Sequence, residues 1–304
     1  MPTGAAADLL SARASAATSN KRRHFLGNLL GVGSLAVLPG RLSADGEEVY
    51  FGLTPVFLSS DLELLTRLRA YLSSALDRSV TLISRRTYQE ITALLLSGQL
   101  DAAWICGYPF IQYRDRLSLL AVPLWRGRPL YQSYLIVDRD RESADILDLE
   151  GDIHAYSDPD SNSGYLVTRA ALADQGRAPN RFFRKTFFTY SHRNVVRAVA
   201  SGLAESGSVD GYVWEVMSEI EPELTSKTQV IRRSEWLGFP PIACASSSGN
   251  TALAAAIGRA FTAMAEDPAG RDVLAMLRLD GFTAGAPSLF DGIAQKYELV
   301  RTLG

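Results

Sequence analysis

The chain has 304 residues, of which 47% are hydrophobic and 21% charged, and these ordinary globular proportions exclude a disordered or low-complexity protein. The formal net charge of -2 provides no global basic field for holding nucleic acid or an anionic membrane. Two cysteines, Cys106 and Cys244, are too few for a disulfide framework or a Cys-rich zinc site, and the three histidines form no metalloprotease motif.

The first 44 residues are expected to be an export signal and not part of the fold. Lys21, Arg22 and Arg23 belong to a twin-arginine pattern, and an apolar stretch of about 14 residues, 25–38, follows it. This stretch is shorter than the roughly 20 residues of a spanning helix, which disfavours the alternative of a permanent membrane anchor. Cleavage after Ala44 would leave 26 basic and 32 acidic residues, a net charge of -6, in a periplasmic chain with no membrane insertion.

Alternating strand and helix patterns predict an α/β fold with mostly parallel sheets. In such sheets, ligands bind beyond the carboxyl ends of the strands. The expected strands are 49–53, 80–83, 102–105, 119–124, 134–137, 152–156, 186–190, a strand that starts at 211–213, and a buried strand within 240–245. The expected helices are 61–76, 88–96, 165–173, 194–200, 252–264 and 272–277.

Small, hydroxylic or mildly reactive residues follow several of these strands, which suits a compact polar ligand. Thr54 follows the first strand, and Cys106 and Tyr108 follow the third. The segment 160–164 (DSNSG) comes after another strand and opens a helix, where free backbone N–H groups can bind a small anion or a hydroxyl group. Taken alone, ordinary helix capping by Ser, Asp and Asn explains this segment better than a ligand does.

Several separated segments, in their order and spacing, resemble the periplasmic binding proteins for phosphate, phosphite and phosphonate. The resemblance spans about residues 48–245 and implies a two-lobed type II binding protein with a two-stranded hinge and an interlobe ligand cleft. We expect lobe 1 to comprise residues 45–136 plus 243–304, and lobe 2 to comprise 137–242. The matching segments are 49–55 (VYFGLTP), 88–108 (YQEITALLLSGQLDAAWICGY), 131–137 (YQSYLIV), 148–166 (DLEGDIHAYSDPDSNSGYL), 188–202 (FTYSHRNVVRAVASG) and 209–212 (VDGY).

The resemblance also implies which residues bind the ligand. The family's oxyanion-binding serine-threonine-serine segment falls on Ser161, Asn162 and Ser163. Asparagine here replaces the usual threonine, and its carboxamide offers an acceptor as well as a donor. Three further family positions, a ligand-facing tyrosine, a cleft histidine and an acidic residue, fall on Tyr131, His192 and Asp210.

Cys106 is the largest departure from the family, which carries a small hydrophobic residue before Gly-Pro at this place. Thiolate sulfur prefers soft metals and metalloids, so Cys106 is expected to be an arsenic(III) ligand. Arsenite or antimonite would exchange one hydroxyl for a bond to sulfur and keep its other hydroxyls for residues 161–163; this neutral ligand needs no arginine. A helix after Gly107 would lower the thiol pKa. Alternatively, Cys106 is a packing residue or forms a disulfide with Cys244.

A cysteine in the cleft makes the chain similar, within this family, to periplasmic arsenite-binding sensors. The resemblance implies a sensor that signals to the periplasmic domain of a membrane histidine kinase, without a cofactor and without nucleic acid. The alternative is an ABC-transporter substrate-binding protein for phosphite, phosphate or a phosphonate. An enzyme with Cys106 as nucleophile and His192 as base is disfavoured, because the two would lie on opposite lobes. His192 could also serve only to cap its own helix.

Overall fold

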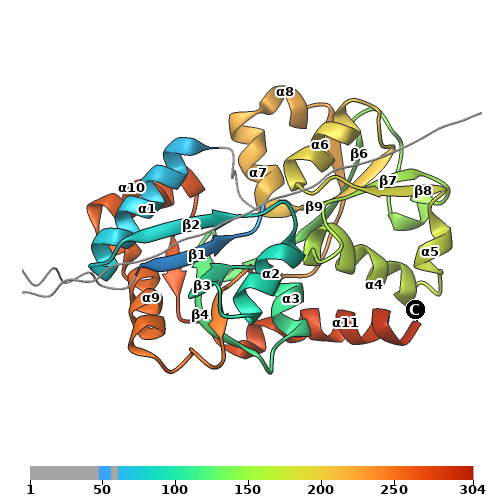
Figure 1. The fold of residues 1–304 in the computed structure, drawn as a ribbon. Coiled ribbons are helices and arrows are strands. Elements are labelled where there is room, and N and C mark those ends of the chain that lie inside the picture. The colour runs from blue at the N-terminus through green and yellow to red at the C-terminus, as the bar shows by residue number, and fades with distance from the viewer. Residues whose placement is uncertain (1–47, 56–60, 304) are drawn as a thin grey trace, which may run out of the picture. The chain divides into compact units, whose positions relative to one another are not determined.

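The structure, a computed structural model, describes residues 48–55 and 61–303 (Figure 1). The expected export signal and its cleavage site lie outside these residues. None of the described helices is long and apolar enough to cross a membrane.

The strands form two larger sheets and one small one. The first sheet has the order β13 (Gly281–Thr283), β4 (Leu117–Leu124), β12 (Ile242–Ala245), β3 (Ala102–Trp104), β1 (Val49–Leu53) and β2 (Val80–Ser84). The second has the order β10 (Thr228–Arg233), β6 (Ser133–Asp138), β9 (Ser206–Asp210), β7 (Ile153–Tyr156) and β8 (Lys185–Phe188). The small sheet pairs β11 (Leu237–Gly238) with β5 (Leu130–Tyr131).

Helices connect the strands of each sheet. The first sheet is accompanied by α1 (Leu62–Leu76), α2 (Tyr88–Leu96), α3 (Gly107–Gln112), α9 (Ala252–Thr262), η3 (Met264–Glu266), α10 (Pro268–Leu277), η4 (Pro287–Phe290) and α11 (Asp291–Leu303). The second is accompanied by η1 (Ile146–Leu149), η2 (Asn162–Leu166), α4 (Val167–Asp174), α5 (Pro179–Phe182), α6 (His192–Ala200), α7 (Gly211–Ile220) and α8 (Pro222–Thr225). In Figure 1, α11 runs past both α3 and α4, and it packs against both helices.

The predicted two-lobed α/β fold with a two-stranded hinge is confirmed. Each lobe carries one large sheet, and the antiparallel β5–β11 pair lies where the chain passes between the lobes. β6 belongs to the second sheet, although residues 133–136 precede the lobe boundary expected at residue 137. The exact lobe limits stay a prediction.

The expectation of mostly parallel sheets is wrong. β1 runs parallel to β2 and β3, and β7 runs parallel to β8 and β9. β12 is antiparallel to both β3 and β4, and β6 is antiparallel to both β9 and β10. β6 and β12 enter their sheets from the hinge and not through a crossover helix, so the alternation of strands and helices does not fix their direction.

The strand expected to start at residues 211–213 is also absent. These residues form the first turn of α7, because the Asp210 carboxylate accepts hydrogen bonds from the backbone N–H groups of Tyr212 and Val213. An aspartate in this position is a strong helix N-cap. β9 therefore ends at Asp210, and the chain turns directly from strand into helix.

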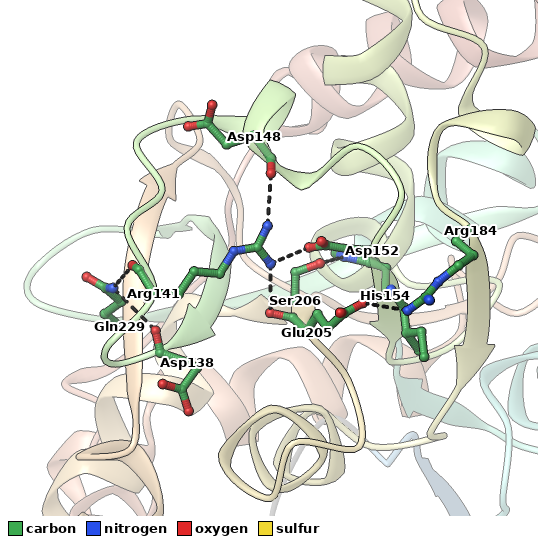
Figure 2. Close-up of polar contacts among 10 residues, drawn as sticks. Asp138, Arg141, Asp148, Asp152, His154, Arg184, Glu205, Ser206 and Gln229 are labelled. Carbon is green, nitrogen blue, oxygen red and sulfur yellow. Dashed lines mark hydrogen bonds and ion pairs between the residues drawn. The ribbon is translucent and has the colours of Figure 1, made fainter.

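Side chains under the second sheet are held by a polar network (Figure 2). Arg141 Nη1 lies 2.6 Å from Asp152 Oδ2, and its guanidinium also donates to the backbone oxygens of Asp148 and Glu205. Asp152 is buried, with 6% of its surface exposed. His154, two residues further along the chain and within β7, uses both ring nitrogens in hydrogen bonds to serine hydroxyls and is fully buried, so it is a satisfied core histidine.

Replacing Arg141 by alanine is expected to lower the free energy of unfolding by about 2–3 kcal/mol, because it leaves the buried Asp152 carboxylate without its charged donor. Arg184→Ala is the matched control. Arg184 pairs with Glu205 in the same network, but both side chains are about half exposed, so we expect a loss below about 1 kcal/mol. Urea denaturation of both variants makes the comparison, and equal losses would contradict the role assigned to Arg141.

Candidate ligand-binding site

Residues from the two lobes and the hinge meet at one place, where several strands end. Cys106 follows β3, segment 157–163 follows β7, and Asp210 closes β9. Tyr131 comes from β5 in the hinge. This is the position in open α/β sheets where ligands bind.

Cys106 contacts the opposite lobe directly. Its Sγ accepts a hydrogen bond from the backbone N–H of Asn162 at 3.2 Å, and the residue is 2% exposed. Cys106 and Cys244 are both free, so the alternative of a disulfide between them is not seen. The sulfur of Cys106 therefore lies at the junction between the first lobe and the start of η2.

The expectation that a following helix lowers the thiol pKa is wrong in its net result. Cys106 is indeed the residue before α3, and N–H groups of Asn162 and Tyr108 favour the thiolate. Burial acts more strongly in the other direction and raises the pKa of Cys106 to about 12. The group is thus a thiol at neutral pH, because removal from water outweighs two backbone donors.

Segment 161–163 begins a continuous helix, since η2 runs into α4. Ser161 caps it: its Oγ accepts from the N–H of Gly164 at 3.0 Å. The Asn162 side chain donates from Nδ2 to the Tyr131 hydroxyl at 2.8 Å. The backbone oxygen of Ser163 accepts from the Ser133 hydroxyl at 2.6 Å. The capping role and the cleft position expected for this segment therefore coexist.

His192 is buried and neutral. Its Nδ1 accepts from the N–H of Asp210 at 3.0 Å, so the ring proton is on Nε2, which lies 3.3 Å from the Tyr88 hydroxyl. Burial lowers the pKa of His192 to about 3. Both ring nitrogens thus have partners other than Cys106, an arrangement that does not suit a base for a cysteine nucleophile.

Three residues at this place were not singled out from the sequence. Tyr88, on α2 of the first lobe, donates its backbone N–H to Asp158 Oδ2 at 3.2 Å, and its hydroxyl meets His192. Ser157 is buried beside His192. One signal could have indicated them: Tyr88 opens the helix after β2, and Ser157 and Asp158 directly follow β7, so all three lie beyond the carboxyl ends of strands.

Gly164 permits this close packing. A Cβ at this position would lie 1.9 Å from Ser157 Oγ and 2.9 Å from His192 Cε1, well inside normal contact distances. A side chain here would force the start of η2 away from β7 and α6. The glycine therefore fixes how near Ser161, Asn162 and Ser163 come to His192.

The side chains of two expected site residues, Thr54 and Tyr108, contact residues outside segment 157–163 and His192. Thr54 is buried at the end of β1, and its hydroxyl donates to the backbone oxygen of Trp104. The half-buried ring of Tyr108 packs against Tyr297 of α11, with ring centroids 5.7 Å apart. Among the expected site residues, Asn162 contacts both Cys106 and Tyr131, and Asp210 contacts His192. That any of the expected residues contacts a ligand stays a prediction.

The site collects acidic and uncharged side chains. Burial raises the pKa of Asp158 to about 6 and that of Asp210 to about 7, even though both carboxyl groups accept backbone hydrogen bonds. Burial also raises the pKa of Tyr88 and Tyr131, with the nearby Cys106 and Asp210 adding to the effect. A ligand that brings a full double negative charge would meet repulsion from these two carboxyl groups.

Asp210→Asn should remove a pH-dependent loss of stability while keeping the helix cap, because asparagine also caps helices. The carboxyl of Asp210 has a pKa of about 7 in the folded chain and about 4 in the unfolded chain, so the folded state binds more protons between these values. Stability from this group consequently falls as pH rises through 7. His154 and His192, whose folded pKa values burial lowers to about 3, act in the opposite direction as pH rises through about 6.5.

Between pH 6.5 and 8.5 we therefore expect the unfolding free energy of the wild-type chain to fall by about 1 kcal/mol relative to that of Asp210→Asn, because the contributions of His154 and His192 are common to both chains and cancel in the comparison. Urea denaturation at the two pH values measures this difference. Asp140→Asn, at an exposed position of the second lobe, should keep the wild-type decline. The same decline in Asp210→Asn would show that the group does not titrate in this range.

Comparisons with known proteins agree with this architecture. A family model described as the periplasmic substrate-binding protein of a phosphonate ABC transporter matches residues 51–290. The structure of a phosphonate-transporter binding protein from Pseudomonas aeruginosa has 20% identity and a TM-score of 0.75, covering 84% of this chain and 87% of that one. PhnD1 from Prochlorococcus marinus, solved with methylphosphonate, has 18% identity and a TM-score of 0.74, covering 84% and 98%.

A histidine kinase sensor domain similar to periplasmic binding proteins matches with 14% identity and a TM-score of 0.53, covering 77% of this chain and 96% of that one. At these identities the solved structures show a shared fold. The family model spans most of the chain, and on that ground the chain belongs to the periplasmic phosphonate-binding proteins of ABC transporters.

Proposed function

We propose that this chain is a periplasmic solute-binding protein that closes its two lobes on a small oxygen-rich ligand, a phosphonate, phosphite or phosphate. The family membership and the fold shared with a methylphosphonate complex support this ligand class, which the sequence alone ranked second. The observation that carries the binding role is the position of Asn162, which contacts Cys106 of the first lobe and Tyr131 of the hinge.

A ligand at this position would work by differential contact. Tyr88 and Cys106 belong to the first lobe, and their partners Asp158, His192 and Asn162 belong to the second. A solute that touches both sets stabilises the closed arrangement relative to an open one, because the open form offers only half of the contacts. Binding without turnover also suits His192, whose ring nitrogens already have partners.

The second candidate ligand is arsenite or antimonite, and the specific observation in its favour is Cys106. The sulfur lies at the start of η2, beside the side chains that would bind a ligand's oxygens. Arsenous acid would react with the thiol to form an arsenic–sulfur bond, and the thiol proton would leave with one arsenic hydroxyl as water. The neutral product suits a site whose ionisable groups are acidic.

With that ligand the chain would act as a sensor whose closed form is recognised by the periplasmic domain of a histidine kinase. The sensor domain of a histidine kinase has a related fold, which agrees with such a role without identifying a partner. With a phosphorus oxyanion the partner would be a membrane permease. In both cases we propose export by the twin-arginine route, on the pattern at Arg22 and Arg23.

Isothermal titration of the purified chain with methylphosphonate, phosphite, phosphate and arsenite decides between the two ligands. Under the first proposal a phosphorus oxyanion binds, and Cys106→Ser changes its affinity by less than about threefold, since serine also accepts the Asn162 hydrogen bond. Under the second proposal arsenite binds, and Cys106→Ser weakens it at least about 100-fold through loss of the covalent bond.

Cys244→Ser is the matched control, because Cys244 is equally buried but lies within β12, paired with Ser118 of β4. It should leave the affinity for every ligand unchanged. Mass spectrometry of the arsenite-treated chain adds an independent readout, since only the covalent proposal predicts an adduct that Cys106→Ser abolishes. Failure of all four solutes to bind would refute both ligand assignments.

A further inference from the structure

The side chain of Asn162 has one polar atom that the described residues leave without a hydrogen bond. Its Nδ2 donates to the Tyr131 hydroxyl, and its backbone N–H donates to Cys106 Sγ. Its Oδ1 is buried and has no hydrogen-bond partner among the residues that the structure describes. The whole residue is 0% exposed.

An amide oxygen in this situation has a definite chemical preference. It can only accept a hydrogen bond, and leaving a buried acceptor unpaired costs free energy. In the observed arrangement Nδ2 donates to the Tyr131 hydroxyl, which leaves Oδ1 as the unpaired amide atom. Exchange of the two amide atoms would let the same hydroxyl donate to Oδ1 and would leave Nδ2 unpaired, and the sulfate comparison below distinguishes the two arrangements. The group that satisfies Oδ1 must therefore carry a proton.

The surroundings favour the same kind of ligand. The carboxyl groups of Asp158 and Asp210 lie close enough to affect the pKa of Cys106, and both oppose added negative charge. Ser157 Oγ, buried next to Gly164, is a second polar atom without a partner in the described part of the chain, and a hydroxyl can pair with it as donor or acceptor. The two carboxyl groups thus add acceptors beside Cys106, and Ser157 Oγ can pair with a ligand hydroxyl.

We infer that Asn162 selects the protonation state of the ligand: its Oδ1 accepts a hydrogen bond from a ligand hydroxyl, so the site takes protonated oxyacids and discriminates against fully deprotonated tetrahedral oxyanions. The inference rests on the proposed binding function but not on which element the ligand contains. Arsenous acid and a hydrogen phosphonate both present hydroxyl groups, whereas sulfate presents none.

The replacement of threonine by asparagine gives this preference a physical origin. A threonine hydroxyl rotates and can donate to an oxyanion or accept from a hydroxyl. The amide oxygen of Asn162 is held in one direction and only accepts. Asn162→Thr should therefore relax the discrimination between protonated and deprotonated ligands, in addition to any general effect on affinity.

The test titrates the wild-type chain at pH 7 with arsenous acid, hydrogen methylphosphonate, hydrogen phosphate and sulfate. Phosphate and sulfate have nearly the same size and shape, and both forms of phosphate present at pH 7, the monoanion and the dianion, carry a hydroxyl that sulfate lacks. We expect at least about tenfold tighter binding of the better of the two phosphorus probes, which do not bond to the Cys106 sulfur, than of sulfate, and about threefold or less in Asn162→Thr. Asn180→Thr, at an exposed position of the same lobe, should keep the wild-type ratio.

The outcomes separate the two levels of the proposal. Binding of sulfate as tight as that of both phosphorus probes would overturn the role of Asn162 while leaving a solute-binding function in place. Binding of sulfate more tightly than of the phosphorus probes would mean that the Asn162 amide nitrogen faces the ligand. This result too would overturn the role of Asn162 and leave a solute-binding function in place. If no probe binds, the proposed function and this inference both fail. The wild-type ratio decides the question even if Asn162→Thr does not fold.

Discussion

The hydrogen bond from the Asn162 backbone to the Cys106 sulfur is the contact around which the site is organised. It joins the N-terminal residue of η2 in the second lobe to the residue that precedes α3 in the first. Its geometry depends on Gly164, which lets η2 approach Ser157 and His192. Because the two partners belong to different lobes, the contact can form only when the lobes meet here, and in that arrangement both residues are buried.

Burial governs the electrostatics of this junction more than specific partners do. Cys106 and His192 are held in their neutral forms, and the pKa of Asp210 lies near neutrality. In each case removal from water is the largest cause, and at Cys106 and Asp210 backbone hydrogen bonds only moderate it. At neutral pH this site carries negative charge on Asp158 and, in part, on Asp210, so ligand recognition depends on the charge of the ligand as well as on the direction of hydrogen bonds.

The sequence predicted most elements that position the site, because strand ends, glycine stops and the DSNSG segment have local signals. Cys106, Asn162 and Tyr131 were predicted to share a cleft and do contact each other. The positions of Tyr88 and Asp158 beyond the ends of strands could be read from the sequence, but their hydrogen bonds could not, since these depend on contact between the two lobes. The pKa of Cys106 was expected in the wrong direction, because a motif shows the helix but not the depth of burial.

The resemblance described above implies that Cys106 and Asn162 are the positions where the chain departs from the family pattern, and in the structure these two residues are in direct contact. Each change alters what the site offers: Cys106 adds a soft sulfur, and Asn162 adds an oriented acceptor. Neither change adds positive charge, which a doubly charged anion would need beside Asp158 and Asp210. Because Cys106 and Asn162 are in contact and both favour a ligand with hydroxyl groups and little negative charge, we infer that together they change which protonation state of a ligand the site binds. The protonation state separates a neutral hydroxide or a hydrogen oxyanion from the dianions that tetrahedral oxyacids form on full deprotonation.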